Sequence, residues 1–196
     1  ELRTPLNAIL GWAHMLRDPE LTLERRQAAI DTILRNAQSQ EQLISDILDV
    51  QRIMAGKIRL NVRTIDLGNV VRAAAETVQP TADAKGIKLQ LLLDLDTPTI
   101  VGDFDRLQQV VWNLLANAIK FTPPGGRITI AAAETAEGLD IRVTDTGCGM
   151  TPEDAERALE PFVQISHPLS DARRGTGLGL SICRELAALH GGRLTI

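Results

Sequence analysis

The chain has 196 residues, of which 44% are hydrophobic, so it can bury one large core or two small ones. A formal net charge of -4, an aromatic content of 3% and the absence of tyrosine argue against a nucleic-acid partner, because such surfaces use basic patches and stacking rings. The two cysteines lack CxxC spacing, and there is no signal peptide or apolar run of roughly 18 residues. We therefore expect a cytoplasmic polypeptide without membrane contact, and an anchor of the parent protein would lie upstream.

Residues 1–56 have the pattern of two long helices joined by a turn. The apolar residues of the first helix recur at steps of 4, 3, 4 and 3, the spacing of a packed helical seam: Leu2, Leu6, Ile9, Ala13 and Leu16. Thr22 is placed to cap a second helix that runs to about Ala55, whose apolar band is wider than a two-stranded coiled coil needs. Two helices supply half of a four-helix bundle, so we expect a homodimer through residues 1–56.

Gly56 ends the second helix, and an entering strand or linker is expected over residues 57–63. In residues 64–196 the expected order is helix 67–85, strands 87–93 and 99–101, helix 103–121, strands 127–133 and 139–144, and helices 152–159 and 177–190. This order predicts an α+β sandwich in which helices cover one face of a mixed sheet. The start without methionine and the strand-like residues 193–196 suggest that both ends are truncated.

One face of the expected helix 103–121 is unusually polar for a helix that otherwise faces a core. At about 100° per residue, Arg106, Asn113, Asn117 and Lys120 share this face, while Asp103 is placed to cap the helix. Carboxamide oxygens are hard ligands and a lysine ammonium is a point charge, so the stripe can hold phosphates and their divalent cation. A solvated polar face would explain the same pattern.

A glycine turn follows the expected strand 139–144. In the run Asp145-Thr146-Gly147-Cys148-Gly149, the glycines let the backbone approach a flat ligand. The Asp145 carboxylate can accept a hydrogen bond from an exocyclic amine. An ordinary Asp-Gly turn is the alternative interpretation.

A second glycine-rich run, Gly175-Thr176-Gly177-Leu178-Gly179, stands before the last expected helix. Its amides and the helix dipole offer a phosphate cradle, and Arg173 and Arg174 can neutralise phosphate charge. The run lacks the Gly-Lys-Ser/Thr of a Walker loop and the third glycine of the dinucleotide fingerprint. Residues 161–174 have the composition of a flap over such a site, or of a long surface loop.

The three histidines carry no metal or nucleophile pattern. His14, His167 and His190 lack nearby acids at a useful spacing, so we interpret each of them as structural. His190 ends the last expected helix, where an imidazolium would suit the helix dipole.

Taken in chain order, these motifs resemble the conserved boxes of sensor histidine kinases. Asn113 with Asn117 and Lys120 resembles the N box, the Asp145 run the G1 box, Pro161-Phe162 the F box, and the Gly175 run the G2 box. The opening Glu1-Leu2-Arg3-Thr4-Pro5-Leu6 resembles the H box without its first letter. The resemblance implies a Bergerat-type ATP-binding domain for residues 64–196 and a dimerisation and phosphoacceptor hairpin for residues 1–56.

The resemblance also implies roles for single residues. It places Asn117 on a magnesium ion with Asn113 in support, Lys120 near the phosphates and Phe121 against the adenine. It implies that Asp145 accepts a hydrogen bond from the adenine amino group and that Gly147 and Gly149 leave space for the ring. It assigns the lid hinge and phosphate cradle to a set made of Arg173, Arg174, Gly175, Thr176, Gly177, Leu178 and Gly179.

In this family the phosphoacceptor histidine directly precedes the position of Glu1. Glu1 would be its general base, and Thr4 would orient water when the phosphorylated response regulator is dephosphorylated. The expected function is transfer of phosphate from ATP, with Mg2+, to histidine and then to an aspartate of a response-regulator receiver domain. Two alternatives remain: an ATPase clamp of the same fold, whose members carry a glutamate at the position of Asn113, and an ATP-gated dimerisation module without histidine phosphorylation.

Overall fold

A computed structural model describes residues 3–93, 99–136, 138–165 and 176–196. The chain divides into two compact units, Glu1–Lys57 and Ile58–Ile196. In the described part of the chain, no helix combines the length and the apolar content that crossing a membrane requires.

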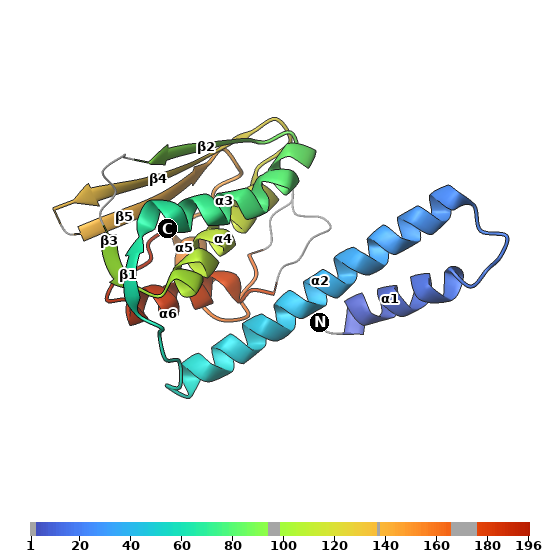
Figure 1. The fold of residues 1–196 in the computed structure, drawn as a ribbon, viewed down its shortest axis with the longest axis horizontal. Coiled ribbons are helices and arrows are strands. Elements are labelled where there is room, and N and C mark those ends of the chain that lie inside the picture. The colour runs from blue at the N-terminus through green and yellow to red at the C-terminus, as the bar shows by residue number, and fades with distance from the viewer. Residues whose placement is uncertain (1–2, 94–98, 137, 166–175) are drawn as a thin grey trace. The chain divides into compact units, whose positions relative to one another are not determined.

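The first unit is a helical hairpin of α1 (Arg3–Met15) and α2 (Leu23–Met54) (Figure 1). Thr22 caps α2 as expected, since its side-chain oxygen accepts a hydrogen bond from the Arg25 N–H at 3.4 Å. Arg26 fastens the turn between the helices, because its guanidinium donates to the carbonyl oxygens of Leu21 at 3.1 Å and Pro19 at 3.2 Å. The turn is therefore held by one cation on several orphan carbonyls.

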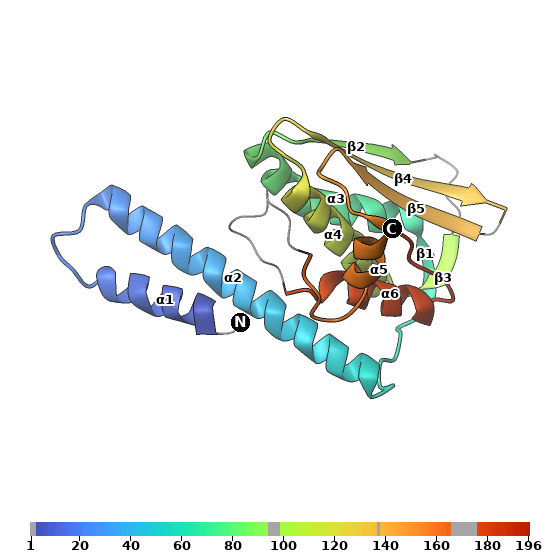
Figure 2. The ribbon, with the colours of Figure 1, turned by 180° about the vertical axis from the view of Figure 1, so that it is seen from behind.

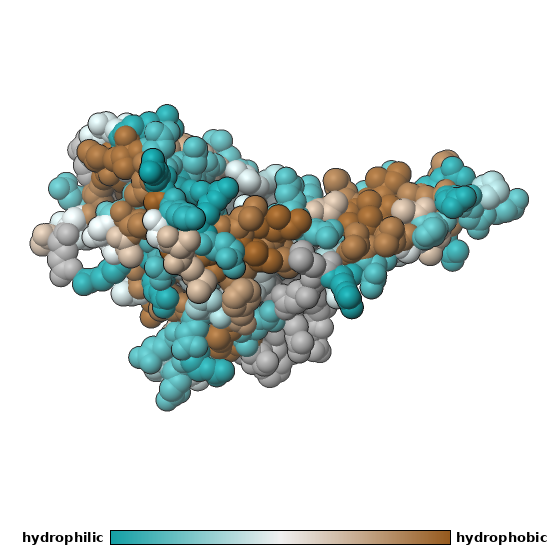
Figure 3. Space-filling model, turned by 90° about the horizontal axis from the view of Figure 1, so that it is seen from below, coloured by the Kyte–Doolittle hydropathy of each residue, from teal (hydrophilic) through white to brown (hydrophobic). Residues whose placement is uncertain are grey.

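The apolar residues of this hairpin are split between two faces. Ile9 and Leu16 of the predicted seam are half-buried, whereas Leu6 of the same seam is 43% exposed. On α2, Leu34 is 55% exposed and Leu48 is 50% exposed. The apolar band of α1 is therefore wider than the single seam expected from the sequence, and only part of it packs against α2. Hydrophobic side chains consequently remain uncovered on the hairpin (Figure 3).

The second unit contains two small sheets and four helices among its described residues. The elements are β1 (Arg63–Asp66), α3 (Leu67–Ala84), β2 (Lys88–Leu93), β3 (Thr99–Gly102), α4 (Phe104–Phe121), β4 (Arg127–Thr135), β5 (Gly138–Asp145), α5 (Pro152–Ala158) and α6 (Gly179–Leu189). β4 pairs in parallel with β2 and antiparallel with β5. β1 and β3 form a separate antiparallel pair.

The strands differ from the expected ones in three details. The strands do not form one sheet, because β1 and β3 pair only with each other in the described chain. Of the two options for residues 57–63, a strand or a linker, the strand includes only Arg63, because β1 begins there and is four residues long like the β3 that it pairs with. Residues 193–196, whose composition suggested a strand, form none. In each case alternation in the sequence was present, but a strand also needs a partner of matching length.

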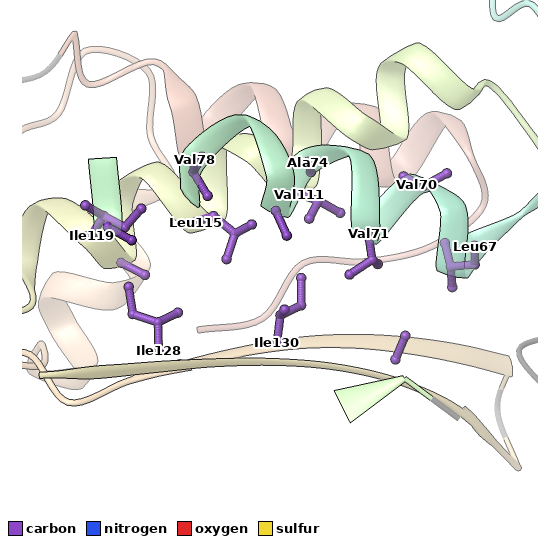
Figure 4. Close-up of a cluster of buried hydrophobic side chains, with 14 of the residues drawn as sticks. Leu67, Val70, Val71, Ala74, Val78, Val111, Leu115, Ile119, Ile128 and Ile130 are labelled. Carbon is purple, nitrogen blue, oxygen red and sulfur yellow. The ribbon is translucent and has the colours of Figure 1, made fainter. Parts of the chain in front are cut away.

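The core lies between α3, α4 and the three-stranded sheet (Figures 1 and 4). Val71 and Val78 of α3 and Leu115 of α4 point toward Ile128 and Ile130 of β4. Each of these side chains is almost completely buried. Burying one such side chain contributes about 1.5–3 kcal/mol, so the apolar stripes of both helices explain why they cover this face.

A buried carboxylate ties the start of α4 to the segment that enters the unit. Asp103 is 6% exposed, and its Oδ1 accepts from the N–H groups of Asp105 at 3.1 Å and Arg106 at 3.2 Å. Its Oδ2 accepts from the N–H of Asn61 at 2.8 Å. The predicted cap is therefore also a tertiary contact across 42 residues of sequence.

The same position joins α4 to the end of α6. The Asp103 N–H donates to Nε2 of His190 at 3.1 Å, and Nδ1 of His190 lies 2.8 Å from the Leu186 carbonyl oxygen. Nε2 therefore accepts from Asp103, and Nδ1 is the ring nitrogen placed to donate to the Leu186 carbonyl. The neighbouring Gly102 leaves room for this contact, because a Cβ there would lie 3.2 Å from the His190 ring and 3.1 Å from Leu107 and would crowd both.

Burial by itself would raise the pKa of Asp103, but the N–H groups of Asn61, Arg106 and Asp105 outweigh it and hold the pKa below the ordinary value of 3.8. The folded state thus binds this proton less readily than the unfolded chain. The carboxylate stabilises the fold above pH 3.8, and the contribution is lost as the pH falls through the lowered pKa.

Replacing Asp103 by asparagine should lower the free energy of unfolding by about 1–3 kcal/mol at neutral pH, because an uncharged amide accepts these N–H groups less well. The deficit should shrink below about pH 4, where the wild-type carboxylate itself becomes protonated. Urea unfolding followed by circular dichroism over a pH series measures both effects.

The matched control is Asp66→Asn. Asp66 caps α3 from a less buried position through one N–H, that of Asn69 at 3.2 Å. Since asparagine is an equally good cap, the control should lose less than about 1 kcal/mol. A deficit for Asp103→Asn that stayed constant across the pH series would contradict the assignment.

Candidate functional site

The polar stripe of α4 lies partly inside the unit. Asn113 is 6% exposed, and its Nδ2 makes no hydrogen bond to any described residue. Asn117 and Lys120 are half-buried on the same helix. Arg106, expected on the same stripe, donates to Gln109 at 2.8 Å and so faces its own helix. Leaving a buried amide unpaired costs about 1–3 kcal/mol of stability. Such a group is typical of a site that binds a ligand.

The last turn of α4 meets the glycine turn that follows β5. A Cβ at Gly147 would lie 2.8 Å from the Phe121 carbonyl oxygen, so the two backbones are in direct contact. Oδ1 of Asp145 accepts from the Gly147 N–H at 2.7 Å. Thr146 fastens the turn to the start of β4, because its N–H donates to the Arg127 carbonyl at 3.1 Å and its hydroxyl oxygen accepts from the Arg127 N–H at 3.0 Å.

The start of α6 borders the same stripe, and the views of Figures 1 and 2 show α6 beside α4. A Cβ at Gly179 would lie 3.3 Å from Oδ1 of Asn113. Among the described residues no side-chain capping hydrogen bond is made at this helix start, since Leu178 occupies the capping position and is itself buried. Uncapped amides at a helix start, together with the helix dipole, favour an anion.

Gly177 holds the segment before α6 against residues 162 and 163. Its φ is 69°, and a Cβ there would lie 2.8 Å from the Val163 carbonyl oxygen, so both the conformation and the space require glycine. The Gly177 carbonyl accepts from the Phe162 N–H at 2.9 Å. Phe162 itself has a φ of 64° and is 64% exposed, an unusual conformation for an aromatic residue. Thr176 accepts from the Leu178 N–H at 3.1 Å.

Lys120 brings a positive charge to the last turn of α4. Burial lowers the pKa of its ammonium, which has few other interactions to offset the loss of water. Its Nζ lies 4.7 Å from the centre of the Phe121 ring, and that ring is 37% exposed. An aromatic face and a cation therefore stand side by side at the end of α4.

Three segments that are distant in the sequence thus converge: α4, the Asp145 turn and the start of α6. They contribute a buried amide, a cation, a partly exposed ring, a turn closed to side chains, and an uncapped helix start. This set suits a ligand with one flat end and one anionic end. The described residues contain no group of three or more His, Cys, Asp or Glu side chains that could hold a metal ion alone. A cation at Asn117 would therefore need further oxygens from the ligand.

Several expected site residues cannot be placed in this geometry. Glu1, Arg173, Arg174 and Gly175 lie outside the described residues, as does most of the expected flap. Thr4 lies on α1 and is exposed. Gly149 has a φ of 66° and open space around it, so its glycine character serves the conformation.

One residue that contacts the end of α4 could not be recognised from the sequence pattern. The Lys85 ammonium, from the end of α3, donates to the carbonyl oxygens of Ile119 at 2.6 Å and Lys120 at 3.0 Å. A lysine before a helix-ending glycine is expected to cap the end of its own helix. Only the packing of α3 on α4 shows that it caps a different one.

Two family models match this chain. The His Kinase A (phospho-acceptor) domain matches residues 1–56. The histidine kinase-, DNA gyrase B- and HSP90-like ATPase matches residues 102–196. These spans fall in the two units of the structure.

Among curated relatives, the histidine protein kinase DivJ of Caulobacter vibrioides is 38% identical over 198 residues, covering 100% of this chain and 33% of the relative. The sensor histidine kinase GacS of Pseudomonas protegens is 38% identical over 201 residues, covering 100% of this chain and 22% of the relative. The chain thus spans about a third or less of the length of these relatives.

Solved structures of histidine kinases also resemble this chain. Full-length ShkA in complex with AMPPNP is 35% identical with a TM-score of 0.72, covering 96% of this chain and 39% of ShkA. The catalytic domain of the histidine kinase ThkA is 26% identical with a TM-score of 0.61, covering 69% of this chain and 87% of that domain.

Proposed function

We propose that this chain, which belongs to the family of sensor histidine kinases, is the catalytic core of an enzyme that moves phosphate from ATP to histidine and then to an aspartate of a response-regulator receiver domain. The observation that carries this proposal is the convergence of the α4 stripe, the Asp145 turn and the start of α6. Residues 1–56 would be the dimerisation and phosphotransfer hairpin, residues 57–63 the linker, and residues 64–196 the ATP-binding domain.

In this proposal the adenine end of ATP meets the end of α4 and the Asp145 turn. The Asp145 carboxylate accepts a hydrogen bond from the exocyclic amine, and the Phe121 ring packs against the base. The glycine at position 147 supports this role of Asp145, because a Cβ there would lie 2.6 Å from Oδ1 of Asp145 and would displace the carboxylate. Gly149 supplies the backbone conformation that the turn needs.

The phosphate end lies toward Lys120, Asn117 and the start of α6. Lys120 pairs with phosphate oxygens, Asn117 ligates a Mg2+ that neutralises their charge, and Asn113 supports that amide. The backbone N–H groups after Gly177 donate to phosphate oxygens. The rest of the lid and cradle would comprise Arg173, Arg174, Gly175, Thr176, Leu178 and Gly179.

The phosphotransfer step requires a histidine next to Glu1. A ring nitrogen of that histidine forms a bond to the γ-phosphorus while the bond to the bridging oxygen breaks and ADP leaves. The Glu1 carboxylate would accept a hydrogen bond from the other ring N–H and take its proton as the ring gains positive charge. Thr4, which is exposed on α1, would orient water when the phosphorylated response regulator is dephosphorylated.

The ATPase-clamp alternative is less well supported. A clamp of this fold needs a carboxylate that activates water, and residue 113 is an amide without a titratable proton. The dimerisation module without phosphorylation has no observation in its favour.

We also propose that the uncovered apolar face of the hairpin binds a second copy of this chain. Exposed Leu6 on α1 and Leu34 and Leu48 on α2 would fill the other half of a four-helix bundle.

The nucleotide assignment predicts the behaviour of Asp145→Asn. Saturating Mg-ADP at about 100 times Kd should stabilise the wild-type chain by about 2.7 kcal/mol, and the variant should lose this effect. Asparagine still offers Oδ1 to the Gly147 N–H, so the turn itself is retained. Thermal unfolding with and without nucleotide measures the loss, and Asp140→Asn on the same strand is the control. An undiminished shift in Asp145→Asn would rule out the assignment.

Phosphotransfer can be tested on a chain that begins with one added histidine before Glu1. Incubation with γ-labelled ATP and Mg2+ should give acid-labile, alkali-stable label, because phosphoramidates of histidine hydrolyse in acid. The same chain with glutamine in place of the added histidine should remain unlabelled. Equal label in both would mean that another residue accepts the phosphate.

The dimer proposal predicts that Leu34→Glu makes the chain monomeric, because a carboxylate would be desolvated in the bundle core. Sedimentation velocity on the whole chain measures this. Arg35→Glu introduces the same side chain at the adjacent exposed position and should leave a dimer. A dimeric Leu34→Glu chain would place the interface elsewhere.

A further inference from the structure

Helix α4 ends without a cap from its own sequence. Thr122 occupies the C-cap position in an extended conformation, with φ of -79° and ψ of 128°, instead of the left-handed conformation that closes many helices. Its N–H returns to the Ala118 carbonyl at 2.9 Å. Pro123 and Pro124 follow and have no N–H to offer. The next carbonyls of the last turn, at Ile119 and Lys120, therefore need donors from elsewhere.

Lys85 supplies those donors from the end of the neighbouring helix. Its Nζ donates to the Ile119 carbonyl oxygen at 2.6 Å and to the Lys120 carbonyl oxygen at 3.0 Å. Helix α3 meanwhile closes its own end with backbone bonds, from the Gly86 N–H to Asp83 and from the Ile87 N–H to Ala82, both at 2.9 Å. Because Gly86 has a φ of 67°, the chain turns away and the Lys85 side chain extends toward α4.

The turn that Lys85 caps carries two groups of the candidate site. Lys120 and Phe121 both belong to it, and their side chains lie 4.7 Å apart as a cation and a ring. The Phe121 carbonyl oxygen packs against Gly147, so the same turn also meets the Asp145 loop. A small rotation of this turn would redirect the ammonium and the ring together.

The charge of Lys85 matters as well as its hydrogen bonds. The carbonyl end of a helix carries roughly half a negative charge, which would repel an anionic ligand at this end of α4. An ammonium bound to two of these carbonyls offsets that charge at the point where it arises.

We propose that Lys85 is a positioning residue of the nucleotide site. By capping α4 from α3, it fixes the direction in which Lys120 and Phe121 meet the nucleotide and neutralises the helix end beside it. This inference rests on the proposed function, because it assumes that the site binds a nucleotide.

The test compares Mg-ADP affinity by calorimetry in the whole chain and in Lys85→Met, which keeps the length of the side chain and removes its donors and charge. We expect Kd to rise about tenfold or more, since two carbonyls lose a charged donor and the turn is released. Lys85→Arg, whose guanidinium can donate to both carbonyls, should recover at least half of the loss on a logarithmic scale. If Lys85→Met does not fold, Lys85→Gln replaces it in the same comparison.

A double-mutant cycle separates positioning from general stability. If Lys85 acts through Lys120, Lys85→Met should weaken binding much less in a Lys120→Ala background than in the wild type. Asp66→Ala removes the cap at the other end of α3, so it should lower the melting temperature without changing Kd. Fully additive effects of the two lysine changes, or an unchanged Kd in Lys85→Met, would overturn the role of Lys85.

The wild-type measurement keeps the two proposals distinguishable. A wild-type chain that binds no Mg-ADP would overturn the proposed function and this inference together. A wild-type chain that binds, combined with a folded Lys85→Met chain that binds equally well, would overturn the inference alone.

Discussion

The buried carboxylate of Asp103 holds together the parts of the ATPase-like unit. Its oxygens accept N–H groups from the start of α4 and from Asn61 in the entering segment, while its own N–H reaches His190 at the end of α6. A buried charge is tolerated only when it is satisfied, and here backbone donors satisfy it without a salt bridge. This one residue therefore joins the start of α4 both to the entering segment and to the end of α6.

Helix α4 then divides two tasks between its faces. Val111, Leu115 and Ile119 enter the core beneath α3, which fixes the rotation of the helix. That rotation puts the unpaired amide of Asn113 against the start of α6 and leaves the ring of Phe121 partly exposed. Burying this polar group costs free energy of folding, and the apolar contacts on the other face of the helix offset that cost. Residues of this kind are expected where function opposes stability.

Much of the fold was readable from local patterns. The caps at Thr22 and Asp103, the helix periods and the strand alternation depend on residues close in sequence, and the structure has these elements within a few residues of their expected bounds. The division into two sheets was not readable, because alternation in β1 and β3 does not say which strand each one pairs with. His190 was placed at a helix end by the sequence, but its partner, a backbone N–H 87 residues away, was not readable there.

For the site, the sequence by itself determined the chemical groups: two amides, a lysine and two glycine runs in the order that a histidine kinase has. Tertiary structure decided which of these groups meet, for instance that Gly147 lies on the Phe121 carbonyl and Gly179 beside Asn113. It also decided that Lys85 caps α4 instead of α3. The physical reason is that residue type and spacing encode local conformation, while contacts between distant segments are set by how their buried faces pack.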